Sequence, residues 1–191
     1  MNDWSKIWLF YLNDKSESNK FDIDIRLLIT NKSDAGCLSK AKKSNISYKI
    51  IKVSDYESKE YFEEEIINTI KKHDIELVVM AGWMKIMSSK FVNAFENKII
   101  NIHPSLLPSF KGNNAIKQAI TSGAKISGCS VHFVEPEVDS GSLIMQAAFS
   151  ISDKDNIDSI TKKIHFLEHE ILPLSISQAG YMLRNGFKGN Y

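Results

Sequence analysis

The chain has 191 residues, 43% of them hydrophobic, a formal net charge of +1, and only two cysteines, Cys37 and Cys129. The balanced charge gives no electrostatic basis for a nucleic-acid or membrane partner, and two distant cysteines without a CxxC exclude a disulfide scaffold. The composition predicts one domain over residues 1–191. No segment has the pattern of a membrane span or targeting signal, so the cytoplasm is the expected location.

Apolar runs alternate with helical patterns through the first two thirds of the chain. Strands are predicted over residues 23–30, 48–53, 76–81 and 98–102. Helices are predicted over residues 35–44, 58–73, 88–95 and 114–122. This alternation is typical of an α/β protein in which helices connect the strands of a parallel sheet.

The pattern changes after Gly123. Residues 127–134 and 143–151 predict two strands joined by a loop that contains Pro, Asp and Gly, which favours an antiparallel pair. Residues 157–185 predict a long helix that Pro173 kinks or breaks. Its apolar stripe contains Ile157, Ile160, Ile164, Leu167 and Ile171. The predicted fold is a Rossmann-like wound, mostly parallel sheet with an added antiparallel C-terminal hairpin and a long terminal helix.

Two polar residues stand where the strand over residues 98–102 ends. Strand alternation places Asn101 and His103 on one face, and open parallel sheets build their sites at the carboxyl ends of strands. Pro104 and Pro108 stiffen the exit loop. A neutral amide donor beside an imidazole suits the oxyanion that forms when a nucleophile attacks an acyl or formyl group. Turn and cap roles for the same two residues are the alternative.

The string from Asn101 to Gly112, NIHPSLLPSFKG, resembles the signature of the folate-dependent formyltransferases. Within them it is most similar to the phosphoribosylglycinamide (GAR) formyltransferases of purine synthesis, because sister families place other residues at the position of Pro104. Two further blocks resemble the same family in the right order: VVMAGWMKIMS over residues 78–88 and SVHFVEPEVDSG over residues 130–141. The resemblance extends from about Asp24 to about Arg184.

The resemblance implies a catalytic group of Asn101, His103 and Asp139. An amine would attack the formyl carbon of 10-formyltetrahydrofolate while Asn101 and protonated His103 hold the oxyanion. Asp139 would keep His103 charged and relay a proton through water toward the departing N10 nitrogen. Without the resemblance, an Asp before Ser-Gly is more typical of a turn that bonds its own backbone.

The resemblance also implies a binding surface for the folate. Flexible apolar side chains suit a flat ring, although a Met and Ile stripe is equally typical of plain core. Lysines stand at two positions where the family more often has Arg, which keeps attraction for a carboxylate but loses the bidentate fork. The predicted cofactor-binding residues are Met84, Lys85, Ile86, Met87, Lys59, Val134, Glu135 and Val138.

The segment HFLEH, residues 165–169, matches a metalloprotease pattern in which two histidines share a helical face. No third ligand is evident, so no metal site is predicted. The resemblance instead aligns Glu168 with a family residue that contacts the glycinamide substrate, and Glu168 and His165 are the predicted substrate-binding residues. His165 stands where a member of that family has Gln. His73 and His132 fit a helix end and a strand face and are assigned no functional role.

The front of the chain departs from the family pattern. The formyltransferases open with a strand and a G-x-G-S-N turn whose backbone N–H groups hold a phosphate, whereas this chain has no glycine before Gly36. Trp4, Ile7, Trp8 and Tyr11 have helical spacing, which favours a truncated first helix over residues 1–20 without the preceding strand and Gly-rich loop. A divergent first strand over residues 6–12 is the alternative.

Three functions follow from these observations. The first is an active GAR formyltransferase that uses 10-formyltetrahydrofolate as co-substrate and no metal. The second is a degenerate or truncated paralogue that binds folate with little turnover, and the third is a formyltransferase for another amine, such as an amino sugar. In each case the expected partners are small molecules, with no nucleic acid or membrane, and the expected state is a monomer or homodimer.

Overall fold

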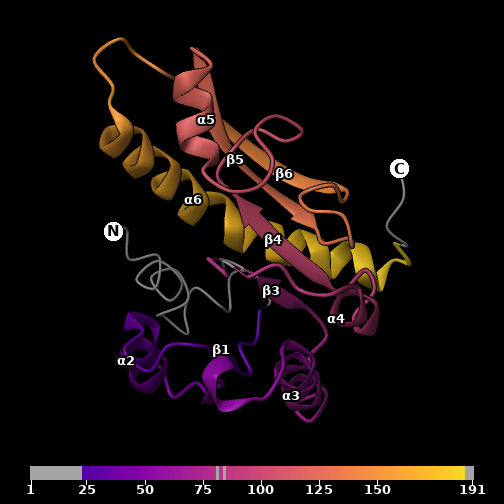
Figure 1. Ribbon diagram of the computed structural model, residues 1–191. Helices are drawn as coiled ribbons and strands as arrows, with labels where there is room; N and C mark the ends of the chain where they lie inside the picture. Colours follow the sequence, from indigo (N-terminus) through magenta and orange to yellow (C-terminus); the bar gives the residue numbers. More distant parts are fainter. Residues whose placement is uncertain (1–22, 81, 84, 188–191) are drawn as a thin grey trace. The chain divides into compact units, whose positions relative to one another are not determined.

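A computed structural model describes residues 23–80, 82–83 and 85–187 (Figure 1). The chain divides into two compact units, a first unit of Met1–Glu76 and Gly82–Phe95 and a second unit of Leu77–Ala81 and Glu96–Tyr191. The predicted truncated helix over residues 1–20 and its alternative strand lie outside the described residues. That residues 1–191 act as a single domain stays a prediction.

The first unit contains a parallel strand pair with a crossover helix. Strands β1 (Leu28–Thr30) and β2 (Tyr48–Ile50) pair in parallel, and α2 (Gly36–Lys43) connects them. Burial of the apolar face of α2 stabilises this unit, with Ala35, Cys37, Leu38 and Ala41 packed against Leu28, Ile46 and Ile50. Both strands are shorter than predicted. Their ladder joins three residue pairs, and the 3₁₀ turn η2 (Val53–Asp55) lies where the second strand was expected to end.

Two capped helices complete the first unit. Ser58 precedes α3 (Lys59–Lys71) and accepts a hydrogen bond from the Tyr61 N–H, and Ser88 precedes α4 (Ser89–Ala94) and accepts one from the Phe91 N–H. Each hydroxyl satisfies a backbone donor that the first turn of a helix leaves without an intrahelical partner. Both helices therefore begin within one residue of the predicted position.

The second unit is built on a four-stranded sheet in the order β3 (Val78–Met80), β4 (Ile99–His103), β5 (Ile126–Phe133) and β6 (Leu143–Ser150). Strands β3 and β4 are parallel, and β5 and β6 extend the sheet as an antiparallel hairpin. Helix α5 (Ala115–Thr121) lies in the connection from β4 to β5. The α/β fold with an appended C-terminal hairpin is confirmed.

The terminal helix α6 (Ile157–Arg184) crosses one face of this sheet and packs on β4, β5 and β6 (Figure 1). Asn156 caps it in a capping box with Ser159. Of the two predicted effects of Pro173, the break is wrong, because the helix continues through this buried residue, and the kink stays a prediction. Pro removes one donor and crowds one carbonyl, and burial of the flanking turns against the sheet offsets that cost. The predicted stripe is corrected at Ile157, which is half exposed, while Ile160, Ile164 and Ile171 are buried.

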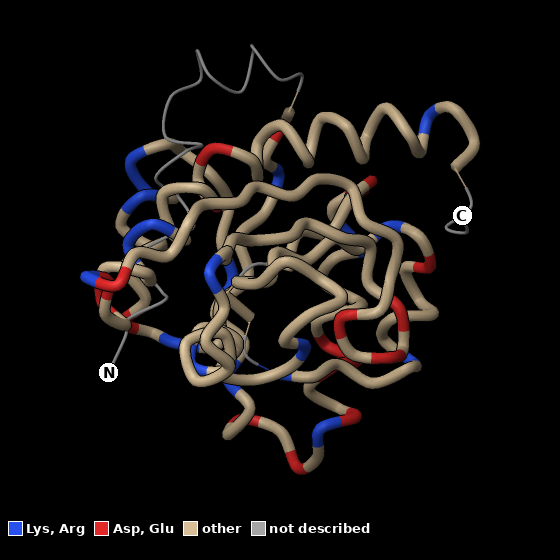
Figure 2. Tube along the Cα trace, turned by 90° about the horizontal axis from the view of Figure 1, so that it is seen from above, with Lys and Arg blue, Asp and Glu red and all other residues tan. Residues whose placement is uncertain are grey.

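Charged residues of both signs are interspersed along the described trace (Figure 2). The last turn of α2 is basic and contains Lys40, Lys42 and Lys43. The next α-helix along the chain, α3, contains an acidic segment. Within the described ranges, no helix combines the length and the apolar content that crossing a membrane requires.

Ile164 tests the packing of α6. Its side chain is 0% exposed, whereas Phe166 on the same helix is 64% exposed. Ile164→Ala should lower the free energy of unfolding by about 2–5 kcal/mol, since it removes buried methyl groups and leaves a cavity. Phe166→Ala, the matched control, should change it by less than about 0.5 kcal/mol. Urea denaturation with both variants measures the difference, and equal effects would contradict the described orientation of α6.

Candidate active site

Strand β4 places two polar side chains at the centre of the second unit. Asn101 and His103 follow the buried Ile99 and Ile100 and lie on the same face of the strand, as predicted. In the ladder with β5, Asn101 is directly opposite His132 and His103 is opposite Ser130. Cross-strand partners lie close enough for side-chain contact, so the antiparallel neighbour decides which groups reach this site.

The loop after β4 is held in place by buried hydroxyl groups. Ser130 Oγ accepts the Leu107 N–H at 3.0 Å and donates to the Ser105 carbonyl at 2.6 Å. Gln146 Nε2 donates to the Leu107 carbonyl at 3.0 Å and to Ser130 Oγ at 2.8 Å. Ser105 Oγ donates to the Ser109 carbonyl at 2.6 Å. The loop after β4 is therefore hydrogen-bonded to both β5 and β6, which satisfies backbone groups that would otherwise be buried without partners.

His103 is buried and faces a hydrogen-bond acceptor at each ring nitrogen. Its Nε2 lies 2.9 Å from the Phe110 carbonyl oxygen, and its Nδ1 lies 3.3 Å from Asp139 Oδ2. A carbonyl only accepts, so Nε2 carries a hydrogen and donates it to Phe110. Phe110 adopts φ 56°, in the left-handed region that bulky residues rarely occupy. The strained backbone at Phe110 presents the carbonyl that orients the imidazole.

Asp139 lies in the loop between β5 and β6 and joins three parts of the site. Besides His103, its Oδ2 accepts the Gly112 N–H at 2.8 Å, and its Oδ1 lies 3.6 Å from His132 Nε2. Its φ of 50° is one that Asp tolerates better than most residues. A Cβ on Gly141, two residues later, would stand 2.0 Å from the Phe133 carbonyl oxygen. The Gly in EVDSG is therefore required for this loop to return close to β5.

His132 is a member of the site that the sequence did not identify. It is 2% exposed, its Nδ1 lies 2.7 Å from the Phe133 carbonyl, and its Nε2 lies 3.4 Å from Asn101 Nδ2. The register of the hairpin shifts between Val131 and His132, an irregularity that re-aims a side chain. The sequence analysis assigned His132 no functional role, whereas the structure shows that it contacts two of the three predicted catalytic residues, Asn101 and Asp139. Only its register opposite Asn101 could have indicated this.

Burial sets the resting charge of the site. It lowers the pKa of His103 below the ordinary value, outweighing the opposite effects of the Phe110 carbonyl and Asp139. Burial acts to raise the pKa of Asp139, but the close approach of His132, the hydrogen bond from the Gly112 N–H and the proximity of His103 bring it below its usual range. As the sequence predicted, Asp139 acts to raise the pKa of His103, but burial has the larger effect. Because Nε2 already carries a hydrogen, a second proton would bind His103 at Nδ1, where it would lie next to the Asp139 carboxylate.

Three of the predicted cofactor-binding residues, Val134, Glu135 and Val138, lie in the same connection between β5 and β6 as Asp139. The Val134 N–H donates to the Ile99 carbonyl at 2.8 Å, which anchors the start of the loop on β4. Glu135 and Val138 are exposed, and Glu137 lies 3.8 Å from Lys111 Nζ. The loop therefore offers backbone groups and exposed side chains next to a buried carboxylate.

The other predicted cofactor-binding residues fall within the boundaries of the first unit. Lys85 and Ile86 are exposed, and Met84 lies outside the described residues. Met87 is buried, and its Sδ accepts the Trp83 Nε1–H at 3.1 Å, so its side chain belongs to the core of the first unit. Lys59 Nζ donates to the Ile86 carbonyl at 2.8 Å. Contact of these residues with a folate stays a prediction.

Glu168 on α6 is a buried acid. It is 4% exposed, burial raises its pKa to about 8, and its proximity contributes to the raised pKa of Cys129 on β5. No hydrogen bond to its carboxyl group is present within the described residues. A buried polar group without a partner is costly and often awaits a ligand. His165 is half buried, and burial together with the nearby His169 lowers its pKa. Across the described residues, no group of three or more His, Cys, Asp or Glu is arranged to hold a metal ion.

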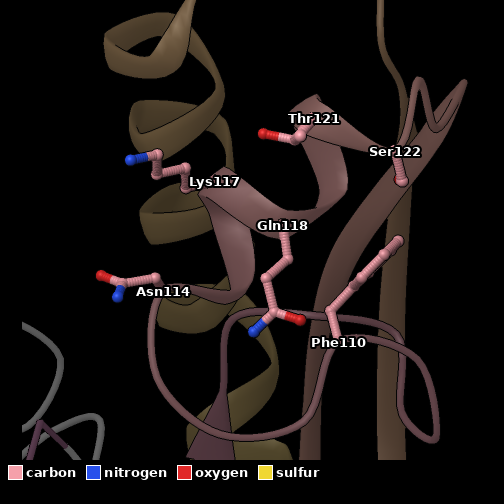
Figure 3. A pocket seen from close by; sticks show the side chains of 6 residues that line it. All are labelled: Phe110, Asn114, Lys117, Gln118, Thr121 and Ser122. Atoms are coloured by element: carbon pink, nitrogen blue, oxygen red, sulfur yellow. The ribbon is translucent and has the colours of Figure 1, made fainter.

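A shallow hollow of about 470 Å³ lies along α5 and contains none of the three predicted catalytic residues. In Figure 3, Lys117 and Asn114 extend away from Phe110, which stands on the other side of the helix. The other lining residues are Gln118, Thr121 and Ser122. Phe110 is the one member of this lining that also contacts His103.

The family assignment follows from comparison with known proteins. The model of the formyl transferase family matches residues 6–176 of this chain. The chain belongs to the formyl transferase family. It is 36% identical over 162 residues to the phosphoribosylglycinamide formyltransferase of Bacillus subtilis, covering 85% of this chain and 83% of that one. A crystal structure of glycinamide ribonucleotide transformylase 1 from Symbiobacterium toebii is similar with a TM-score of 0.86 and 30% identity, covering 93% of this chain and 83% of that one.

Other relatives of this formyl transferase are much longer. It is 40% identical over 164 residues to the trifunctional purine biosynthetic protein adenosine-3 of Chironomus tentans, which covers 85% of this chain but only 12% of that protein. The predicted similarity to the phosphoribosylglycinamide formyltransferases is confirmed by the single-function relatives. The family also implies a folate-derived formyl donor.

Glu168 gives a prediction for stability. A carboxyl group whose pKa rises from 4.5 to about 8 on folding destabilises the folded state progressively as the pH increases through that window. Glu168→Gln stays neutral, so its free energy of unfolding relative to the parent should increase by on the order of a few kcal/mol between pH 4.5 and 8. Urea denaturation across this range measures the difference. The exposed Glu170→Gln is the control, and identical pH profiles for the two variants would contradict the prediction.

Proposed function

We propose that this chain transfers the formyl group of 10-formyltetrahydrofolate to the amine of glycinamide ribonucleotide, a step of de novo purine synthesis. The observation that carries the proposal is the buried contact of His103, Asp139, His132 and Asn101 in a member of the formyl transferase family. The single-function relatives carry the name of this activity and match most of the chain. The degenerate-paralogue and other-amine alternatives have no comparable support.

The proposed chemistry uses each residue in one role. The amine attacks the formyl carbon, and the new C–N bond forms as the carbonyl oxygen gains negative charge. Asn101 Nδ2 has two hydrogens, and only one of them is directed toward His132, so the other is available for the oxyanion. His103 also stabilises the oxyanion when its Nε2–H donates to the substrate oxygen in place of the Phe110 carbonyl. We assign Glu168 to the substrate because a polar ligand group would satisfy its buried carboxyl.

Proton transfer uses Asp139 and the two histidines next to it. The amine loses a proton as it attacks, and the N10 nitrogen of the donor gains one as its bond to the formyl carbon breaks. Asp139 lies beside both imidazoles and has its pKa below the usual range, so it is ionised and able to stabilise a proton held by either ring. The products are tetrahydrofolate and the formylated amine, with no covalent enzyme intermediate.

The decisive experiment incubates the purified chain with 10-formyltetrahydrofolate and glycinamide ribonucleotide and follows the release of tetrahydrofolate. Parallel reactions contain glycinamide riboside, which lacks the phosphate, and an amino sugar. Turnover that is fastest with the ribonucleotide supports the proposal. Folate binding without turnover supports the degenerate paralogue, and preference for the amino sugar supports the other-amine alternative.

His103→Ala and Asp139→Asn should each lower kcat/KM for formyl transfer by about two to four orders of magnitude, because both groups act on the transition state. Binding of a folate analogue, measured by calorimetry, should change by less than about threefold. His73→Ala is the matched histidine control, since His73 in the first unit bonds the Thr69 carbonyl. Activity at the parent level in both site variants would refute the proposed mechanism.

Two variants of His132 separate its two nitrogens. An Asn side chain places an amide near the Nδ1 position, and a Gln side chain places one near the Nε2 position. His132→Asn keeps the contact with Phe133 but loses the group facing Asn101 and Asp139, so kcat should fall by about 10–100-fold, the effect expected of an orienting partner. His132→Gln should lose less. Steady-state kinetics distinguishes them, and a larger loss in the Gln variant would show that the Phe133 contact matters more.

A further inference from the structure

The loop between β4 and α5 contains three left-handed residues at alternate positions. Phe110, Gly112 and Asn114 have φ angles of 56°, 76° and 61°. Among the described residues outside its chain neighbours, nothing would lie within 4 Å of a Cβ on Gly112, so glycine is needed here for its backbone angle. Type I and type II turns differ by rotation of one peptide, and a glycine can follow that peptide in either orientation. The Lys111–Gly112 peptide therefore keeps one orientation only if other groups hold it.

Both polar groups of the Lys111–Gly112 peptide are hydrogen-bonded, and they are bonded on opposite sides. The Lys111 carbonyl accepts a hydrogen bond from Gln118 Nε2 at 3.2 Å, and the Gly112 N–H donates to Asp139 Oδ2 at 2.8 Å. These two groups point in opposite directions in a trans peptide, so one rotation of the peptide would break both bonds. Hydrogen bonds in series also polarise one another, so the bond from Gln118 strengthens the donor that faces Asp139.

Gln118 forms a second bond to the same loop. Its Nε2 also donates to the Asn113 carbonyl at 2.8 Å, so its two hydrogens hold the carbonyls of the residues on either side of Gly112. Carbonyls only accept, and this requires the amino end of the side chain to face the loop. The Gln118 N–H donates to the Asn114 carbonyl at 2.9 Å, which fixes the residue in the first bonded turn of α5. Figure 3 shows the side chain extending from α5 toward the loop.

The Gly112 N–H favours the ionised form of Asp139. Burial acts to raise the pKa of this carboxyl group, whereas the approach of His132, the Gly112 hydrogen bond and the proximity of His103 lower it. His103 reaches the carboxylate from β4 at 3.3 Å, and His132 reaches it from β5 at 3.6 Å. The other charged side chains of the two loops and of α5 are exposed: Lys111, Lys117, Glu135 and Glu137. Loss of the Gly112 bond would therefore raise the pKa of Asp139 while leaving both histidine contacts in place.

We propose that Gln118 is a positioning residue of the formyl-transfer site, and that its amide fixes the Lys111–Gly112 peptide in the orientation that bonds Asp139. This inference rests on the proposed function and adds to it a residue of α5 that acts through the loop. Gln118 is exposed, so its bonds are made at the surface and act on the buried carboxylate through one peptide. No motif identified this residue, because its role depends on the loop that it bonds.

Two variants test the peptide without any substrate. Gln118→Glu keeps the shape of the side chain and replaces the amino group with an oxygen, and Gln118→Met keeps the length and removes every donor. NMR measures hydrogen exchange of the Gly112 amide at the same pH in each protein. Both variants should exchange this hydrogen about 10-fold faster or more than the parent, because the peptide is released from one orientation. Thr121→Val is the matched control, since it removes a polar group from an exposed side chain at the other end of α5 (Figure 3) and should leave this exchange unchanged.

Kinetics of formyl transfer test the consequence for the site. In both Gln118 variants kcat should fall about 5- to 50-fold, while the KM of each substrate stays within about threefold of the parent, since Asp139 acts on the transition state. The acid limb of the kcat profile against pH should move to higher pH, because a carboxyl group with a raised pKa ionises later. This limb belongs to Asp139 together with His103 and His132. Thr121→Val should keep the kcat and the pH profile of the parent.

The two readouts keep the hypotheses separate. Thermal unfolding identifies a variant that does not fold, in which case the other Gln118 variant carries the test. Unchanged Gly112 exchange in a folded variant would overturn the inference, and so would an unchanged kcat with an unchanged pH profile. Absence of formyl transfer by the parent chain would refute the proposed function. The exchange measurement would then still decide whether Gln118 positions the peptide, since faster exchange supports that role and unchanged exchange overturns it.

Discussion

Folding of the second unit removes a group of polar side chains from water. The positions of its loops depend on the hydrogen bonds and ion pairs that satisfy these side chains. Asp139 is the centre of this group, since its carboxylate is shared by His103, His132 and the Gly112 N–H. An uncompensated charge at this depth would cost several kcal/mol, so the loops that bring these donors together are required for stability as well as for chemistry. Asp139 and Phe110 adopt left-handed backbone conformations, and this local strain is part of the free-energy cost of bringing the polar groups together.

The same constraint acts independently in the first unit. Glu63 is nearly as buried as His132, and it is satisfied by a helix N-cap and a lysine. In both units a buried acid is bonded to a neighbouring loop, and exposed side chains lie close by in the sequence: Val138 next to Asp139, and Lys85 and Ile86 shortly before Ser88, the partner of Glu63. Buried hydrogen-bonded anchors of this kind restrict the backbone next to them, which lowers the entropic cost of any binding at a neighbouring site.

Local sequence predicted most elements of the fold, and the errors have identifiable causes. Helices α3 and α4 begin where Ser58 and Ser88 predicted, because capping is a local interaction. The strand expected over residues 23–30 is described only over Leu28–Thr30, since strand length depends on the extent of the ladder with β2. Helix α6 continues past Pro173 because packing on the sheet outweighs a local helix-breaking preference.

The sequence by itself determined the alternation of strands and helices, the placement of Asn101 and His103 on one strand face, and, through its three motifs, the formyl transferase family. These depend on side-chain periodicity and residue identity, which are written along the chain. Tertiary structure alone decided that His132 contacts Asn101, that burial lowers the pKa of His103 and raises that of Glu168, and that Lys59 and Glu63 bond to Ile86 and Ser88. Each of these depends on the register of distant segments or on the exclusion of water, which no local pattern encodes.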